Sequence, residues 1–475
     1  MDRTARTDAN ATANAGGPGR APGRRESARG GSSRGLGGLL PRPIAFWMVA
    51  AVQVFLLFAS SAPSPLYVVY QAKFHFSATT LTGVFAVYVL ALMAALVFAG
   101  SLSDHLGRRP VVIGALLVEI AAMVAFAGAD GVAGLYVARV VQGLATGVAT
   151  SAISAALIDL QHPEKPRQGT LINSVAPTFG LAAGALGTGL LVQYAPDPTH
   201  LIFLLLLGIF AVGVIGILMM AEPVDAQGGA LRSLRPQVGV PRELRGDFFV
   251  VMPCLVAVWA LGGLYLSLGP SVAVGILHVH SHLVGGLVIF TLTGVAALTS
   301  VVLRAWPPRR AMFAGQIGLI LGIALTLIAL AAPSTVLFFI GTAIAGVGFG
   351  VSFLGAYGTL VPLAAPNQRG AVISSLYIVG YLAFSLPAIA AGTAVTQVGL
   401  HPTINVYGAA VIALAAIVLA RLVVRGGRDA RTSVIDHDGQ PSASLPPPGP
   451  CTVPPCAPTV AVLHSATVAV DEPAP

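Results

Sequence analysis

The chain has 475 residues, of which 55% are hydrophobic and only 9% are charged. Soluble domains carry about a quarter charged residues, so this composition excludes an ordinary water-soluble protein. Apolar stretches of about 20 residues, the length that crosses a bilayer, recur along most of the chain and indicate a polytopic membrane protein. The net charge of +8 does not indicate nucleic-acid binding, because the arginines stand in short breaks between apolar stretches.

In chain order, residues 1–42 are rich in Gly, Arg, Ser and Ala and are expected to form a disordered cytoplasmic tail. Twelve candidate spans follow, at 43–70, 79–99, 111–129, 132–158, 169–193, 199–221, 247–276, 283–303, 311–331, 334–362, 369–398 and 402–425. Residues 222–246 form a polar loop in the middle, and the Pro-rich residues 426–475 are expected to be a second disordered cytoplasmic tail.

The sequence therefore predicts an all-α membrane protein with twelve transmembrane helices in two six-helix halves, 43–221 and 247–425. The halves resemble each other, because a shift of about 200 positions aligns "GLATG" (Gly143 to Gly147) with "GVGFG" (Gly346 to Gly350). Basic residues gather in the breaks on one side of the membrane, which places both termini in the cytoplasm.

The first span contains "SSAPSPLYVVYQ", which Pro63 and Pro65 interrupt. A proline cannot donate to the carbonyl four residues earlier, so it leaves that carbonyl without its helical partner. Inside a membrane, such carbonyls need protein groups or a wet cavity as partners.

The break after the second span reads "GSLSDHLGRRPVV" and concentrates charge. Gly100 and Gly107 permit a tight turn and close helix approach. Asp104 is expected to accept hydrogen bonds from the N-terminus of a neighbouring helix, where the dipole favours an anion. Arg108 and Arg109 hold the loop in the cytoplasm and can pair with acids.

Glu119 and Arg139 lie deep inside spans, away from the charged breaks. A charge at the membrane centre costs at least about 2.5–3.5 kcal/mol, so such residues usually face a cavity and are functional. With a rise of about 1.5 Å per residue, Glu119 and Arg139 differ in depth by roughly 8 Å. A direct pair requires both side chains to be extended, and a water-bridged pair is easier. Glu119 is either a proton carrier or a neutral acid that is hydrogen-bonded to a neighbouring helix.

These residues carry a family resemblance. "GSLSDHLGRRPVV" resembles the loop signature G-x-L-x-D-x-x-G-R-[RK] of the major facilitator superfamily, and "LYVARVVQGLATG" resembles its helix-4 motif R-x-x-Q-G through Arg139, Gln142 and Gly143. The resemblance implies transport by alternating access, a loop that acts as a conformational latch, and a part for Arg139 in proton coupling, with a structural tie to backbone or glutamine as the alternative. The fifth span, "GLAAGALGTG", matches the family's exporter signature only in part, because Ala185 stands at its proline position.

Several polar and aromatic residues inside spans are candidates to line the substrate cavity. They are Gln53, Tyr88, Asn173, Trp259, Tyr265, Tyr357, Tyr377 and Tyr381. Helix packing is the alternative role for each of them. Together they indicate an aromatic, weakly charged cavity that suits amphipathic or cationic organic compounds better than multivalent anions.

No cofactor or metal is expected. The run "HVHSH" (His278, His280, His282) lacks an accompanying acid, the three cysteines form no metal or redox motif, and no phosphate-binding loop is present. The driving energy must therefore come from an ion gradient or from a separate ATPase subunit.

The sequence favours a monomeric, non-enzymatic transporter in a bacterial plasma membrane that exports small organic molecules or drugs in exchange for protons. The bilayer, the substrate and protons are its expected partners, and nucleic acid is not. The bias toward arginine, with 26 Lys and Arg of which only Lys73 and Lys165 are lysines, indicates a GC-rich bacterial genome. The alternatives are an uptake symporter or uniporter for a sugar or organic acid, and a non-transporting membrane sensor on the same fold.

Overall fold

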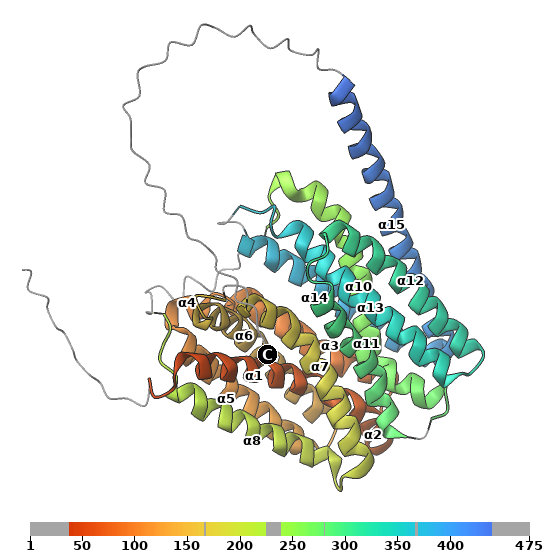
Figure 1. Ribbon diagram of the computed structural model, residues 1–475. Helices are drawn as coiled ribbons and strands as arrows, with labels where there is room; N and C mark the ends of the chain where they lie inside the picture. The colour runs from red at the N-terminus through yellow and green to blue at the C-terminus, as the bar shows by residue number, and fades with distance from the viewer. Residues whose placement is uncertain (1–37, 166–167, 225–238, 280, 366–368, 439–475) are drawn as a thin grey trace, which may run out of the picture. The chain divides into compact units, whose positions relative to one another are not determined.

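The computed structural model describes residues 38–165, 168–224, 239–279, 281–365 and 369–438. These residues form helices and no strand (Figure 1), which confirms the predicted all-α fold. The helices are α1 (Arg42–Ser61), α2 (Pro63–Phe74), α3 (Ala78–Ala99), α4 (Leu102–Leu106), α5 (Arg108–Ala127), α6 (Val132–Leu160), α7 (Gln168–Tyr194), α8 (Pro198–Met219), η1 (Arg242–Leu244), α10 (Arg245–Gly275), α11 (His282–Val302), α12 (Pro308–Ala331), α13 (Thr335–Leu360), α14 (Arg369–Val398) and α15 (Leu400–Asp438).

Among the described residues, twelve segments are long and apolar enough to cross a membrane, which confirms the predicted number of spans. The first joins α1 and α2 from Arg42 to Phe74, and the seventh joins η1 and α10. The last helix, α15, continues to Asp438, although the sequence predicts a disordered tail from residue 426. The predicted span stops where hydropathy falls, but no proline interrupts the helix before Pro441. The remaining tail residues and most of the central loop lie outside the described residues.

Glycines bring the helices of the first half into close contact. A Cβ atom on Gly143 of α6 would lie 2.8 Å from the Cβ of Ala91 on α3. A Cβ atom on Gly180 of α7 would lie 2.8 Å from the Cβ of Leu57 on α1. Both separations are too short for a larger side chain, so these small residues serve close helix packing.

The described residues divide into two units, one that ends at Ala420 and one that begins at Arg421. The two halves meet within the first unit, where α7 of the first half packs against α11 of the second and α3 packs against α14. At the α7–α11 crossing, a Cβ atom on Gly286 would lie 3.1 Å from the Cα of Gly189. The same Cβ atom would collide with the carbonyl oxygen of Ala185, the residue that stands at the proline position of the exporter signature.

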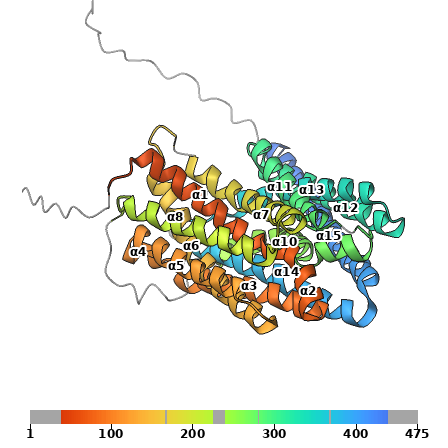
Figure 2. The ribbon, with the colours of Figure 1, turned by 90° about the horizontal axis from the view of Figure 1, so that it is seen from below.

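The two ends of the helix bundle differ in charge, and we name them after landmarks. The α4 end carries the loop with Arg108 and Arg109, and the His75 end carries the turn between α2 and α3; α4 and α2 lie at opposite ends in both views (Figures 1 and 2). Hydrogen bonds between the halves are found at the His75 end. Thr79 Oγ1 donates to the carbonyl of Gly392 over 3.2 Å, and Ser281 Oγ donates to Gln193 Oε1 over 3.1 Å.

Candidate functional site

A buried polar cluster lies inside the first half and is formed by Glu119, Arg139, Gln142, Thr146 and Tyr67. The side chains of Glu119, Arg139, Gln142 and Thr146 have no exposed surface, and Tyr67 is 1% exposed. α5 contributes the acid, α6 contributes the arginine, glutamine and threonine, and α2 contributes the tyrosine. Charged groups survive such burial only when neighbouring groups satisfy them, so the cluster's hydrogen bonds determine what it can do.

Neutral oxygen atoms hold the guanidinium of Arg139. Its Nε and Nη2 donate to the hydroxyl of Tyr67 over 2.9 and 2.6 Å. Its Nη1 donates to the carbonyl of Ser60 over 3.0 Å and to Gln142 Oε1 over 2.7 Å. The hydrogen bonds of Arg139 that we observe thus go to neutral acceptors on α1, α2 and its own helix.

Aromatic rings complete the surroundings of Arg139. Its Cζ lies 4.9 Å from the ring centroid of Tyr88, 5.5 Å from that of Tyr67 and 5.7 Å from that of Phe126. The faces of aromatic rings attract cations, and the attraction grows when water is excluded. The hydroxyl of Tyr88 donates to Ser60 Oγ over 2.6 Å, which fixes this ring beside the guanidinium.

An amide connects the acid to the arginine. Gln142 Nε2 donates to Glu119 Oε1 over 3.3 Å, while its Oε1 accepts from Arg139. Thr146 Oγ1 lies 3.4 Å from the other oxygen of Glu119 and donates to it. The sequence leaves open a direct or a water-bridged pair between Glu119 and Arg139; the structure instead places the side chain of Gln142 between them.

The proline break of the first span supplies partners for this cluster. Pro63 cannot donate to the carbonyl of Ala59, four residues earlier, and Gln142 Nε2 donates to that carbonyl over 3.0 Å instead. The next carbonyl, of Ser60, accepts from Arg139. The sequence-based expectation that protein groups satisfy carbonyls at this break is confirmed, and the groups are the two residues of the R-x-x-Q-G motif.

A second charge cluster lies at the α4 end, around Arg108. Its side chain is 11% exposed and pairs with Asp104 four residues earlier. Its Nε donates to Asp159 Oδ2 at the end of α6 over 3.0 Å, and its Nη1 donates to Ser103 Oγ over 2.8 Å. Arg42 at the start of α1 donates to the carbonyl of Asp159 over 2.8 Å. Arg108 therefore joins the loop to α5 and α6, with α1 attached through Asp159.

The anion at the N-terminus of α5 is Glu222, whereas Asp104 pairs with the side chain of Arg108. The backbone N–H groups of Arg108 and Arg109 donate to the two carboxylate oxygens of Glu222 over 2.7 and 3.0 Å. Gly107, which has a φ of 94°, is the single residue between α4 and α5. Asp104 lies on the short helix α4, where it pairs with Arg108. Arg109 bonds through its side chain to the carbonyl of Leu218 near the end of α8.

The second half contains an aromatic cluster, formed by Trp259, Phe353, Tyr357, Tyr377, Tyr381 and Phe384. The Trp259 ring lies 4.9 Å from Tyr381, 5.6 Å from Phe384 and 6.3 Å from Phe353, between ring centroids. Tyr377 stacks on Tyr381 at 5.8 Å. These rings are partly exposed and come from α10, α13 and α14. Four of the eight predicted cavity residues are thus brought together.

The aromatic cluster touches the first half. Phe384 lies 5.2 Å from Phe85 of α3, between ring centroids. Phe85 precedes Tyr88 by three residues, so one face of α3 carries both the ring against the aromatic cluster and the ring against Arg139. α3 is therefore the element between the two sites.

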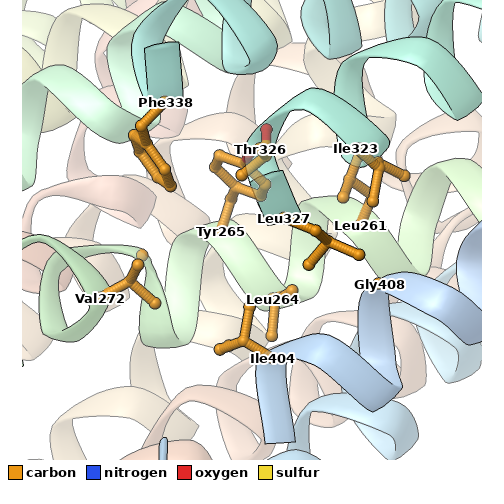
Figure 3. Close-up of a pocket in the computed structure, with 11 residues that line it drawn as sticks. Leu261, Leu264, Tyr265, Val272, Ile323, Thr326, Leu327, Phe338, Ile404 and Gly408 are labelled. Carbon is orange, nitrogen blue, oxygen red and sulfur yellow. The ribbon is translucent and has the colours of Figure 1, made fainter. Parts of the chain in front are cut away.

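The other predicted cavity residues lie elsewhere. Tyr88 belongs to the surroundings of Arg139. Tyr265 donates to or accepts from Thr342 over 3.1 Å and lines a separate apolar cavity with Leu264, Phe338 and other residues of α10, α12, α13 and α15 (Figure 3).

Two further candidates are held in helix contacts of the first half. The Gln53 side chain is 1% exposed, and its Oε1 has no hydrogen-bond partner among the described residues. Asn173 donates to the carbonyl of Ser154 over 3.0 Å. Neither residue belongs to the aromatic cluster, and their place in the substrate cavity stays a prediction.

No group of three or more possible metal ligands occurs among the residues that the structure describes. His280 and the side chain of His282 lie outside this set.

Sequence reasoning missed three residues of these sites: Tyr67, Asp159 and Glu222. Tyr67 lies four residues, or about one helical turn, after the proline break at Pro63. Because the break faces the polar cluster, this spacing could have identified Tyr67 as a member of the cluster. Asp159 and Glu222 each close a span beside a basic loop. The sequence indicates that these acids can pair with loop arginines, but it does not indicate which arginine each one meets.

Comparison with known proteins places the chain among transporters. A model described as Major Facilitator Superfamily matches residues 49–388. The multidrug resistance protein MdtL of Klebsiella pneumoniae (strain 342) is 26% identical over 168 residues, and the match spans 35% of this chain and 42% of the relative. The fold is similar to that of the human organic anion transporter MFSD10 (TETRAN), at 18% identity and a TM-score of 0.58, with 80% of this chain and 100% of that chain covered. It is also similar to the nucleoside transporter NupG, at 13% identity and a TM-score of 0.63, with 80% and 99% covered.

Proposed function

Since the chain belongs to the Major Facilitator Superfamily, we propose that it exports small organic molecules, drugs among them, in exchange for protons. The two halves rock about a site near the middle of the membrane, so that the site opens to one side at a time. The partial likeness to a multidrug resistance protein supports export.

The buried polar cluster is the observation that carries this proposal. Glu119 is a fully buried acid in the middle of α5, and Arg139 and Gln142 lie beside it. From Phe248 to Ala420 the second half has no acidic residue at all. A carrier of protons in the membrane interior needs a carboxyl or imidazole group there, and Glu119 is the carboxyl that the fold provides.

The substrate site includes the aromatic cluster. Its rings offer flat apolar surfaces and cation-attracting faces, and no charged side chain belongs to it. Amphipathic or cationic aromatic compounds fit this chemistry best. Contact between Phe384 and Phe85 places the cluster next to the helix that also carries Tyr88.

The α4 end faces the cytoplasm of a bacterial cell, with the protein as a monomer in the plasma membrane. The support is the basic loop at that end, because cytoplasmic loops carry an excess of Lys and Arg. There the Arg108 cluster acts as a latch. It fixes the loop to α5, α6 and α8, so that the loop moves with the first half as one body.

The test is transport in vesicles that contain the purified full chain. An imposed pH gradient should drive movement of ethidium, a flat aromatic cation, and Glu119→Gln should abolish the effect of the gradient. Glu164→Gln, at a residue whose side chain is 84% exposed, is the matched control and should transport normally. Gradient-driven transport that persists in Glu119→Gln contradicts proton coupling through Glu119, and substrate movement with the proton instead of against it favours the uptake alternative.

A further inference from the structure

The position of Gln142 between an acid and an arginine suggests more than a packing role. An arginine side chain has only donors, so the amide atom that faces Arg139 must be the oxygen. The amide nitrogen then faces Glu119, where the carboxyl must present an acceptor. The orientation of the amide is therefore fixed by Arg139 and suits an ionised Glu119.

The dipole of the Gln142 amide is aligned with the two charges beside it, because its oxygen faces the cation Arg139 and its nitrogen faces the carboxylate of Glu119. Hydrogen bonds in a chain strengthen one another, above all when both ends are charged and the surroundings are apolar. Arg139 draws electron density toward Gln142 Oε1, which makes the Nε2 hydrogens better donors to Glu119 Oε1. The carboxylate in turn strengthens the acceptor that Arg139 uses.

Protonation of Glu119 disturbs this arrangement. The cluster then changes from a balanced pair of charges to a net positive charge, and the acceptors observed for Arg139 are neutral. The other titratable groups near the cluster are tyrosines: Tyr70 on α2, Tyr88 on α3 and Tyr136 on α6. The remaining large neighbour of α5 is α8, which has no ionisable residue after His200 in its first turn.

We propose that Gln142 is a positioning residue that transmits the protonation state of Glu119 to Arg139 through its side-chain amide. This inference rests on the proposed function, because it gives proton binding at Glu119 a route to α3 by way of Arg139 and the ring of Tyr88. Phe85 on the same helix touches the aromatic cluster, so the route ends at the substrate site.

The experiment measures how strongly Arg139 influences proton binding at Glu119, with and without the amide. Infrared difference spectroscopy of the full chain in lipid nanodiscs follows the C=O band of protonated carboxyls against pH, and Glu119→Gln identifies the band of Glu119. The pH midpoint of that band is measured in four proteins: the natural chain, Gln142→Met, Arg139→Met and the double variant.

In the natural background, Arg139→Met should raise the midpoint by about one pH unit, which is about a tenfold change in proton affinity. In the Gln142→Met background, the same substitution should raise it by less than about a third of that amount, because the amide no longer connects the two groups. Thr146→Val removes the donor to the other carboxyl oxygen and serves as the control. In that background the effect of Arg139→Met should be unchanged. If Gln142→Met does not fold, Gln142→Asn replaces it, since its shorter side chain cannot span both partners.

Equal effects of Arg139→Met with and without the Gln142 amide would overturn the relay and leave Glu119 as a proton carrier. Absence of any carboxyl band that depends on Glu119 would overturn both the relay and the proposed proton coupling.

Discussion

Glu222 offers the sharpest test of how the loop at the α4 end is held. Its carboxylate accepts from the backbone N–H groups of Arg108 and Arg109 over 2.7 and 3.0 Å, at the first turn of α5. Replacement of Glu222 by Ala leaves both donors to water and removes a negative charge from the positive end of the helix dipole.

The expected cost follows from the geometry. A hydrogen bond to a charged group contributes about 1.5–3 kcal/mol when it is shielded from water, and loss of a helix cap costs about 0.5–2 kcal/mol. Because Glu222 is exposed, we place the effect of Glu222→Ala at about 1–2 kcal/mol, near the value for a cap. For a chain of 475 residues that corresponds to a fall of roughly 1–2 °C in Tm, because the entropy of unfolding is about 2.1 cal/mol/K per residue.

The assay is thermal unfolding in detergent, with Glu164→Ala as the matched control. Glu164 is also an exposed acid beside a basic loop, but the contact found for its carboxylate in the described part of the chain is with the His162 ring, at 4.0 Å. Glu164→Ala should leave Tm unchanged, and Glu222→Gln should fall between the two because it keeps one acceptor. Equal Tm values for Glu222→Ala and Glu164→Ala would refute the claim that this carboxylate stabilises α5.

Three further predictions concern the interior. Tyr67→Phe removes the acceptor of two Arg139 donors and should lower the free energy of unfolding by about 2–3 kcal/mol, which is seen as a lower Tm. Tyr70→Phe is the control and should be neutral, because the buried Tyr70 hydroxyl has no partner among the described residues. Similar Tm values for the two variants would contradict this assignment. Gly286→Val should separate α7 from α11. The assay is disulfide formation between cysteines introduced by Gln193→Cys and Ser281→Cys, because the natural side chains at these positions hydrogen-bond over 3.1 Å, and Gly286→Val should reduce it. Undiminished cross-linking would contradict the crossing of α7 and α11 as a contact between the halves. In a Cys451→Ala, Cys456→Ala background, buried Cys254 should react with maleimide only after unfolding in SDS, and labelling of the folded chain would show that the site opens to water.

Much of the fold follows from composition alone. Spans of apolar residues with charged breaks have few arrangements in a membrane, so twelve helices and their order were predictable. The proline pair at Pro63 and Pro65 also predicts a local need for partners, since a missing N–H has a known consequence for one carbonyl. Both inferences use rules that act within a single helix.

The contacts between helices were less predictable. A depth estimate places Glu119 and Arg139 at different heights but does not give the rotation of α5 against α6, so the bridging role of Gln142 was missed. The cap of α5 comes from Glu222, more than 100 positions later in the chain, while Asp104 is close in sequence and was the natural candidate. Of the eight predicted cavity residues, the structure gathers only those whose rings face one another across α10, α13 and α14.

The absence of acids and lysines between Phe248 and Ala420 has an electrical consequence. The arginines of that segment, Arg304, Arg309, Arg310 and Arg369, stand at helix ends or between helices. Membrane voltage does work of about 2.3 kcal/mol on each elementary charge moved through 100 mV. Because the charges of the second half lie at helix ends or between helices, the voltage acts mainly on the ionisable groups of the first half and on a charged substrate. Exchange of one proton for a neutral compound would then carry current, whereas exchange for a monovalent cation would be electrically silent.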